Sequence, residues 1–323
     1  MARNESRSSE RRRRHGGGPK QLPWGQPVNR FRPLEILSAD QLEAIHQASL
    51  TVLEEIGIEV LSQEALRLFE AAGASLDRSQ SLVCLDRALV EEKIALAPAA
   101  FTLAPRNPDH ALEIGGNYHC FSLVAGPPSV SDLDRGRRPG NFEDYCNLLR
   151  LAQSLNVIHY VGNQPVAPIE LNAEQRHLDC YRANATLTDR VFQVSAIGAE
   201  RAIDGIAIAA LARGESLEEL AKRPAVATII NVNSPRRLDG PMSDGLIAMA
   251  RHGQPVIVTP FTLMGAMTPV TLAAALVQQN AEALFGIVLV QLAKAGAPVI
   301  YGGFTSNVDM KSGAPAFGTP EYT

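Results

Sequence analysis

The chain has 323 residues, of which 46% are hydrophobic and 20% are charged, and its formal net charge is −4. This balance allows a large hydrophobic core. The small negative charge and the 5% aromatic content argue against a nucleic-acid-binding protein. The four cysteines form no CxxC pair, which is typical of free thiols in a reducing compartment.

Nothing in the sequence indicates secretion or membrane insertion. The basic N-terminal stretch is not followed by the apolar segment of a secretory signal. The most apolar stretch, residues 281–293, is interrupted by Glu282 and Gln291 and is shorter than a membrane span. We therefore expect a cytoplasmic protein without a membrane or nucleic-acid partner, and we expect it to be a homo-oligomer.

The N-terminal part divides into a tail and a small mixed region. Residues 1–33 contain the basic run Arg11–Arg14 and a glycine run, which predict a disordered tail; contact of the tail with an acidic partner or a nucleic acid is the alternative. Residues 34–110 predict an α+β region. There, Ser38 and Gln41 match a capping box at the start of a helix that ends at Gly57. A helix at 63–72, a strand at 82–85 and a helix at 86–96 follow.

From residue 111 to 323, short apolar runs alternate with helical segments. This alternation predicts βαβ units and a parallel sheet, since buried parallel strands are continuous β-branched runs such as VATIINV. The predicted strands are 118–124, 157–161, 191–197, 225–232, 256–261 and 299–304, and the predicted helices are 141–154, 172–187, 199–212, 240–252 and 269–295.

We interpret this α/β pattern as a (β/α)8 TIM barrel with about six β/α units present. A dinucleotide-binding Rossmann fold would have a glycine-rich turn after its first strand, and VAGPPSVSD contains one glycine. Residues 111–323 would then form an incomplete barrel domain, and the absence of a closing helix suggests a truncated C-terminus.

The ends of the predicted strands carry the candidate site, because barrel enzymes place their active sites at the carboxyl ends of their strands. These ends are rich in amides, hydroxyls and glycines and almost free of charge. They contain no Ser-His-Asp set, no paired carboxylates and no phosphate-binding loop. The predicted substrate-binding residues are Asn163, Gln164, Asn231, Asn233, Phe261, Tyr301, Phe304 and Asn307.

The aromatic members of this set have two interpretations. Phe261, Tyr301 and Phe304 could offer π-faces to a quaternary ammonium, or they could be ordinary barrel packing. No residue is assigned a catalytic role.

Two other polar groups also remain open. His177 and Cys180 lie one turn apart and could share a metal, but a zinc site needs three or four converging ligands, so we predict no metal site. The run containing Asn280 and Glu282 is either a polar network near the strand ends or a solvated turn.

Three segments resemble the trimethylamine methyltransferase family, including its members that lack pyrrolysine. They are LEAIHQASLTVLEEIGIEV at 42–60, NVNSP at 231–235 and, most specifically, QNAEALFGIVLVQLAKAGAPVIYGG at 279–303, which continues into MKSGAPAFGTPE. The resemblance covers nearly all of residues 34–323.

This resemblance implies a barrel enzyme that moves a methyl group from a methylated amine to a Co(I) corrinoid. Trimethylamine and quaternary amines such as glycine betaine are substrates in the family, and a separate small protein carries the corrinoid. The pyrrolysine position of the family is expected beyond Thr323, so no catalytic residue is carried over. Arg236 and Arg237, next to NVNSP, could bind a substrate carboxylate or the partner protein, or they could be exposed loop residues.

Two alternatives remain. A lyase or aldolase would need a lysine at a strand end, and the nearest lysines, Lys294 and Lys311, do not occupy one. The other alternative is a non-catalytic barrel that binds a quaternary amine, or an inert fragment.

Overall fold

A parallel sheet forms the centre of the molecule. The computed structural model describes residues 20–320. The five strands of the sheet lie in the order β14-β12-β10-β9-β8, so that each strand pairs with the one before it. These strands are β8 (Tyr160–Val161), β9 (Val191–Gln193), β10 (Val226–Ile230), β12 (Val256–Val258) and β14 (Val299–Tyr301).

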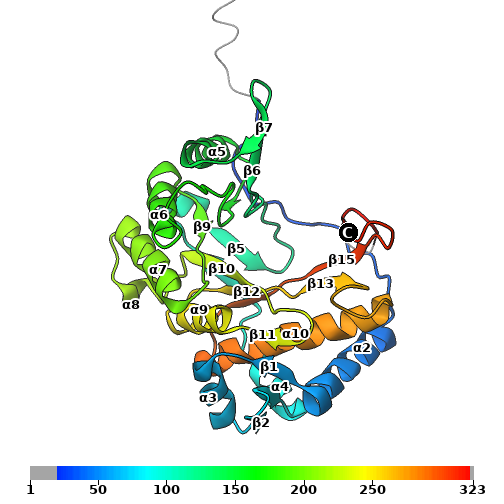
Figure 1. Cartoon of the computed structure of the whole chain (residues 1–323). Coiled ribbons are helices and arrows are strands. Elements are labelled where there is room, and N and C mark those ends of the chain that lie inside the picture. Colours follow the sequence, from blue (N-terminus) through cyan, green and yellow to red (C-terminus); the bar gives the residue numbers. More distant parts are fainter. Residues whose placement is uncertain (1–19, 321–323) are drawn as a thin grey trace, which may run out of the picture.

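Helices cover the outer, convex face of this sheet, as Figure 1 shows. They are α5 (Phe142–Ser154), α6 (Arg176–Leu187), α7 (Ala199–Arg213), α8 (Leu217–Leu220), α9 (Gly240–Arg251) and α10 (Leu272–Ala293). The helix starts follow local rules, since Asn141 caps α5 and Asp239 caps α9 through their side chains. The packing is close. A Cβ on Gly286 of α10 would lie 2.6 Å from Val258 Cγ1 on β12, so only glycine fits there.

The strand register puts one row of side chains on the concave face. Ile229 pairs with Ile257, and Ile257 pairs with Ile300. Because side chains alternate along a strand, the neighbours Ile230 and Val258 point outward and are fully buried under the helices.

The N-terminal region packs against both the helices and the sheet. Its elements are α2 (Ala39–Thr51), a π-helical turn (Val52–Ile56), β1 (Ile58–Val60), α3 (Gln63–Ala71), β2 (Ser75–Asp77), β3 (Leu82–Cys84), α4 (Arg87–Ile94), β4 (Ala100–Leu103), a 3-10 turn (Pro108–His110) and β5 (Leu112–Gly115). The predicted capping box is confirmed, with Ser38 and Gln41 bonded reciprocally.

The N-terminal region and the sheet share one continuous hydrophobic core. The strand β1 pairs in parallel with β11 (Arg237–Leu238), which follows β10. One cluster of buried residues runs from Leu50 on α2 to Leu289 on α10. By length and composition α10 could cross a membrane, but 67% of its apolar window is buried inside the protein, as expected for a core helix.

Short strands extend the sheet beyond its carboxyl end. The strand β13 (Phe261–Met264) continues from β12, and β15 (Phe304–Val308) continues from β14. The two pair in parallel, and β16 (Pro315–Ala316) closes onto β15. At the other edge of the sheet, the hairpin of β6 (Ser129–Asp132) and β7 (Gly136–Pro139) projects outward (Figure 1).

Three expectations need correction. The mixed α/β class and the strand–helix alternation are confirmed, but the described residues form an open sheet and not a closed barrel. The segment 118–124 forms no ladder; its link to β8 is the single parallel bridge Ser122–Tyr160. The segment is held by isolated bridges, at Ser122 to β8 and at Tyr118 to Val28, so it has fewer hydrogen bonds to keep it extended than a strand inside the sheet.

The third correction concerns the N-terminal tail. Residues 1–19 lie outside the described part, but ordered contacts begin before the predicted boundary at Leu34. The Gln21 side chain bonds to Ser154 O at 2.9 Å and accepts from Asn156 N at 2.7 Å. Trp24 packs against the cluster that contains Leu103. Long-range contacts of this kind leave no periodic signal in a polar segment.

Candidate active site

The carboxyl ends of the strands carry half-buried amides that have no hydrogen-bond partner among residues 20–320. Asn163 follows β8, Asn231 follows β10 and Asn307 lies on β15. Each is partly exposed, and within the described residues none of their side-chain amides makes a hydrogen bond. Such groups can donate to and accept from a ligand without first breaking a protein hydrogen bond.

The other two predicted amides are already engaged. Gln164 Nε2 lies 3.9 Å from Cys180 Sγ and so points towards α6. Asn233 Oδ1 accepts from Asp239 N at 3.3 Å, in the turn that leads to α9. The five predicted amides therefore divide into three free ones and two that hold loops.

The aromatic residues meet where β13 and β15 pair. Phe261 lies directly opposite Phe304, and their rings stack with centroids 4.6 Å apart and planes 12° apart. Each of these two rings uses one face for packing against the other, as the packing interpretation expects. Tyr301, at the end of β14, is 46% exposed, and its hydroxyl donates to Asn280 Oδ1 at 3.2 Å. Tyr301 is thus the most exposed ring of the three.

Hydroxyl groups join these strands to α10. The Thr262 and Thr305 hydroxyls lie 2.7 Å apart across the β13–β15 pair. The Thr262 hydroxyl also lies 3.3 Å from Gln279 Oε1 on α10. Neutral hydroxyl and amide groups therefore join this end of the sheet to α10.

The run containing Asn280 and Glu282 is a polar network and not a solvated turn. Glu282 is fully buried and accepts from Ser234 Oγ at 2.5 Å, Arg236 N at 2.8 Å and Gln278 Nε2 at 2.8 Å. Burial raises the pKa of the Glu282 carboxyl, and these hydrogen bonds oppose the rise.

Arg236 and Arg237 turn away from the strand ends. The Arg236 guanidinium donates to Gly57 O at 3.0 Å, and Arg237 Nε lies 3.1 Å from Glu59 Oε2 on β1. Both arginines are therefore bonded to the N-terminal region. They are not available to bind a substrate carboxylate at the strand ends.

The structure gives no support for a metal site. Within residues 20–320, no three His, Cys, Asp or Glu side chains converge as metal ligands. His177 Nε2 lies 2.8 Å from Asp204 Oδ2, between α6 and α7 and on the outer face of the sheet. The pairing of His177 with Cys180 considered from the sequence is thus replaced by a pairing with α7.

A cavity of about 320 Å³ lies on the concave face of the sheet. It is lined by the isoleucine row of β10, β12 and β14, by Gln193 and Tyr160, and by Leu103 and Ile114 from the β4–β5 hairpin. Sequence reasoning missed the hairpin, because its contribution depends on contacts between residues about 120 positions apart. The cavity is mostly apolar, while the polar amides lie beyond it at the carboxyl ends.

Comparison with known proteins decides the family. The family model described as trimethylamine methyltransferase matches residues 3–323. The chain belongs to the trimethylamine methyltransferase family. It is 37% identical over 286 residues to a glycine betaine methyltransferase of Desulfitobacterium hafniense strain Y51, covering 88% of this chain and 59% of that relative.

Other family members differ in their named substrates. A trimethylamine methyltransferase of D. hafniense strain DSM 10664 is 32% identical, covering 88% of this chain and 57% of the relative. A proline betaine:corrinoid methyltransferase of Eubacterium limosum is 28% identical, covering 91% and 61%. The chain therefore spans about three-fifths of the length of these curated relatives.

Solved structures include the monomethylamine methyltransferase of Methanosarcina barkeri. It aligns with a TM-score of 0.46 at 10% sequence identity, covering 84% of this chain and 59% of that chain.

Proposed function

We propose that the protein transfers a methyl group from a methylated amine to the Co(I) corrinoid of a separate partner protein. The observation that carries the proposal is the neutral carboxyl end of the sheet in a chain of this family, where three amides without a partner among the described residues and a tyrosine ring that is 46% exposed lie beyond the apolar cavity. Relatives named for trimethylamine, glycine betaine and proline betaine support a methylated amine as the substrate.

The chemistry requires little proton transfer by this chain. A Co(I) corrinoid would supply the nucleophile that attacks the methyl carbon, while the protein binds and orients the amine. A cationic methylammonium group is disfavoured near positive charge and favoured near aromatic faces. The Arg236 guanidinium is bonded to Gly57 O and that of Arg237 to Glu59, which keeps both groups out of the site.

Each free group has a place in this proposal. The exposed part of the Tyr301 ring, which points towards α10, would face the ammonium, and the Phe261–Phe304 stack would offer a second aromatic surface at the same end of the sheet. Asn163, Asn231 and Asn307 would donate to or accept from the rest of the amine, including the carboxylate of a betaine. The remaining predicted residues, Gln164 and Asn233, would hold the loops on which these amides lie.

We also propose that the open sheet has the plan of a (β/α)8 barrel. The strictly sequential order of parallel strands, with helices outside and a row of β-branched residues inside, supports it. In this plan the corrinoid protein would dock over the carboxyl ends.

The experiment is a methyl-transfer assay with the protein that carries this chain. Cob(I)alamin is incubated anaerobically with trimethylamine, glycine betaine or proline betaine, and methylcobalamin is followed by its absorbance. We expect methylcobalamin to form with at least one of these amines. Calorimetric binding of an amine without any turnover would support the non-catalytic binding alternative instead.

The lyase alternative has less structural support. Lys294 caps the C-terminal end of α10, which lies near the amino ends of the strands, and Lys311 lies in the turn between β15 and β16. Neither lysine lies at the end of a strand of the parallel sheet, where Schiff-base chemistry would require it.

A further inference from the structure

Glu282 is a buried acid that the proposed methyl transfer does not use. It lies on α10 with no exposed surface, and its carboxylate accepts three hydrogen bonds, from Ser234 Oγ, Arg236 N and Gln278 Nε2. A buried carboxylate is costly unless it is fully hydrogen-bonded. Glu282 therefore costs stability inside an apolar helix, and the positions of its three partners indicate its role.

Two of these partners belong to the segment that leaves the carboxyl end of β10. Ser234 and Arg236 lie three and five residues after Asn231, one of the free amides. Within the same segment, Asn233 and Arg237 exchange backbone hydrogen bonds of 2.7 and 2.9 Å. Glu282 on α10 thus fixes a compact turn, and this turn directly follows Asn231, a predicted substrate-binding residue.

The third partner extends the network to the next strand end. Gln278 Nε2 donates to Met267 O at 3.0 Å as well as to Glu282. Met267 lies in the turn after β13, the strand that carries Phe261 and Thr262. One carboxylate therefore links the loops that follow two neighbouring strands.

The guanidinium of Arg236, the cationic residue of this network, points away from Glu282. The Arg236 side chain reaches Gly57 O, while its backbone N–H serves Glu282. Among the described residues Glu282 makes no ion pair, and the groups that contact its carboxylate are a hydroxyl, an amide and a backbone N–H. Geometry, and not charge neutralisation, is what these contacts provide.

We propose that Glu282 is a positioning residue, whose hydrogen bonds fix the segment 231–237 and so aim the Asn231 amide at the methylated amine. This inference rests on the proposed function. It extends that function by assigning the substrate geometry to a residue outside the predicted binding set.

The same helix supplies a matched control. Gln291 lies nine residues further along α10 and is 2% exposed. It donates to Ala297 O at 2.9 Å and accepts from Gly296 N at 2.8 Å, before the amino end of β14. Gln291→Ala also removes buried hydrogen bonds from α10, but at the end of the sheet away from the candidate site.

The test compares Glu282→Ala, Glu282→Gln and Gln291→Ala, each checked for folding by circular dichroism and assayed well below its melting temperature. For glycine betaine and for trimethylamine, kcat and KM are measured with cob(I)alamin as acceptor. We expect Glu282→Ala to lower kcat/KM by about 100-fold, the effect of a misplacement of roughly 1 Å, mainly through KM. Glu282→Gln should recover most of the loss, since its amide can still bond to Ser234, Arg236 and Gln278.

Gln291→Ala should leave KM at the wild-type value despite its loss of stability. Equal KM values for Glu282→Ala and Gln291→Ala would overturn the proposal, as would a Glu282→Gln variant no better than Glu282→Ala. Lack of turnover by the wild type would refute the proposed function separately. Calorimetric dissociation constants for glycine betaine, compared between the same variants, would then still decide whether Glu282 positions the ligand site.

Discussion

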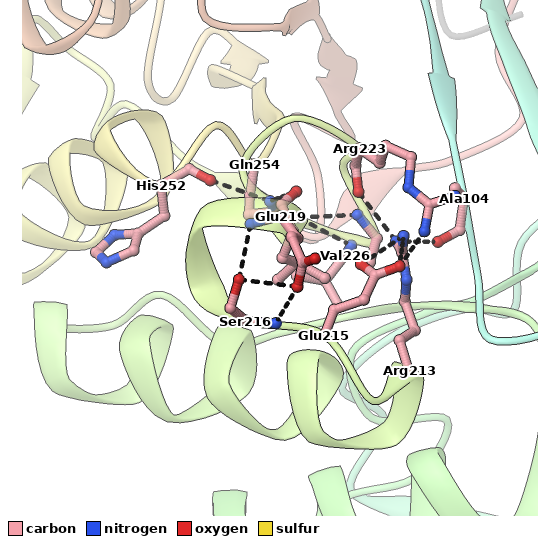
Figure 2. Close-up of polar contacts among 11 residues, drawn as sticks. Ala104, Arg213, Glu215, Ser216, Glu219, Arg223, Val226, His252 and Gln254 are labelled. Atoms are coloured by element: carbon pink, nitrogen blue, oxygen red, sulfur yellow. Dashed lines mark hydrogen bonds and ion pairs between the residues drawn. The ribbon is translucent and has the colours of Figure 1, made fainter.

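The two ends of the parallel sheet are built from different chemistry. At the amino end, Gln254 is fully buried just before β12 and makes four hydrogen bonds. Its Oε1 accepts from the backbone N–H groups of Ala225 and Val226, and its Nε2 donates to the carbonyls of Leu220 and His252. Figure 2 shows this side chain beside the polar contacts that end α7 and α8.

Charged groups tie further elements together at the same end. Arg213, at the end of α7, donates to Ala104 O at 2.7 Å and Arg223 O at 3.0 Å, and it pairs with Glu215 (Figure 2). Glu215 also pairs with Arg223. These contacts join α7, the segment before β10 and the residue after β4. The polar groups at the amino end are therefore hydrogen-bonded or ion-paired with one another.

The carboxyl end has the opposite character. Asn163, Asn231 and Asn307 have half-buried side-chain amides without a partner in the part of the chain that the structure describes, and Tyr301 is 46% exposed. Paired polar groups stabilise a fold, whereas unpaired ones at the carboxyl ends of strands are available to a ligand. The difference predicts that the loss of a paired polar group lowers stability and that the loss of an unpaired group at the carboxyl end lowers activity.

The largest expected effect is the loss of Gln254. Gln254→Ala would leave two backbone N–H groups and two carbonyls without this partner, and it should lower the free energy of unfolding by about 3 kcal/mol. Urea unfolding followed by circular dichroism measures the change. The KM of the folded fraction for a methylated amine should equal that of the wild type, and a raised KM would break the distinction between the two ends.

A charged pair at the carboxyl end of the sheet tests whether a paired group contributes to stability there as well. Arg138, on β7, pairs with Asp144 in the first turn of α5, and Asp144 is 6% exposed. The side-chain hydrogen bonds from Arg138 hold the pKa of Asp144 below its usual value. We expect Asp144→Asn to lower the free energy of unfolding at neutral pH by about 2 kcal/mol, less than for a fully buried pair.

The pH dependence of this variant has a definite sign. A lowered pKa in the folded state stabilises the protein above the carboxyl's unfolded pKa, and this contribution disappears as the pH falls through the folded pKa. The difference between wild type and Asp144→Asn should therefore shrink in acid. A difference that stayed constant down to the acid-unfolding range would show that the ion pair does not supply the stability.

The smallest expected effect is on ligand affinity at Tyr301. Tyr301→Ala removes the exposed ring and should raise KM for a quaternary amine about 5-fold, the size of a modest cation–π interaction. Tyr301→Phe keeps the ring and loses only the bond to Asn280, so its KM should stay close to the wild-type value. If Tyr301→Phe raised KM as much as Tyr301→Ala did, the hydroxyl, and not the π-face, would be the contact.

Much of the fold follows from local signals in the sequence. The capping residues Ser38, Asn141 and Asp239 and the apolar periodicity place the helix starts within a few residues, and β-branched runs place the central strands. The strands proved shorter than the runs, because apolar residues continue into the turns beyond the last paired residue. The segment 118–124 shows the limit, since its β-propensity is not matched by a full set of partners.

The candidate site was less predictable. The positions of strand ends locate the polar residues, but their side-chain directions depend on the loops around them. Gln164 and Asn233 look equivalent to Asn163 and Asn231 in the sequence, yet each is bonded within the protein. Arg236 and Arg237 are likewise directed by a strand from the N-terminal region, about 180 residues away in sequence. Contacts of this range leave no periodic pattern to read.

The most direct test of the account follows a label from substrate to corrinoid. Glycine betaine and trimethylamine carrying ¹³C in their methyl groups are incubated with the protein that carries this chain and with cob(I)alamin, and the products are analysed by mass spectrometry. The account predicts labelled methylcobalamin and one demethylated amine for each label transferred. Unlabelled cobalamin, with an amine that is bound but not demethylated, would contradict it.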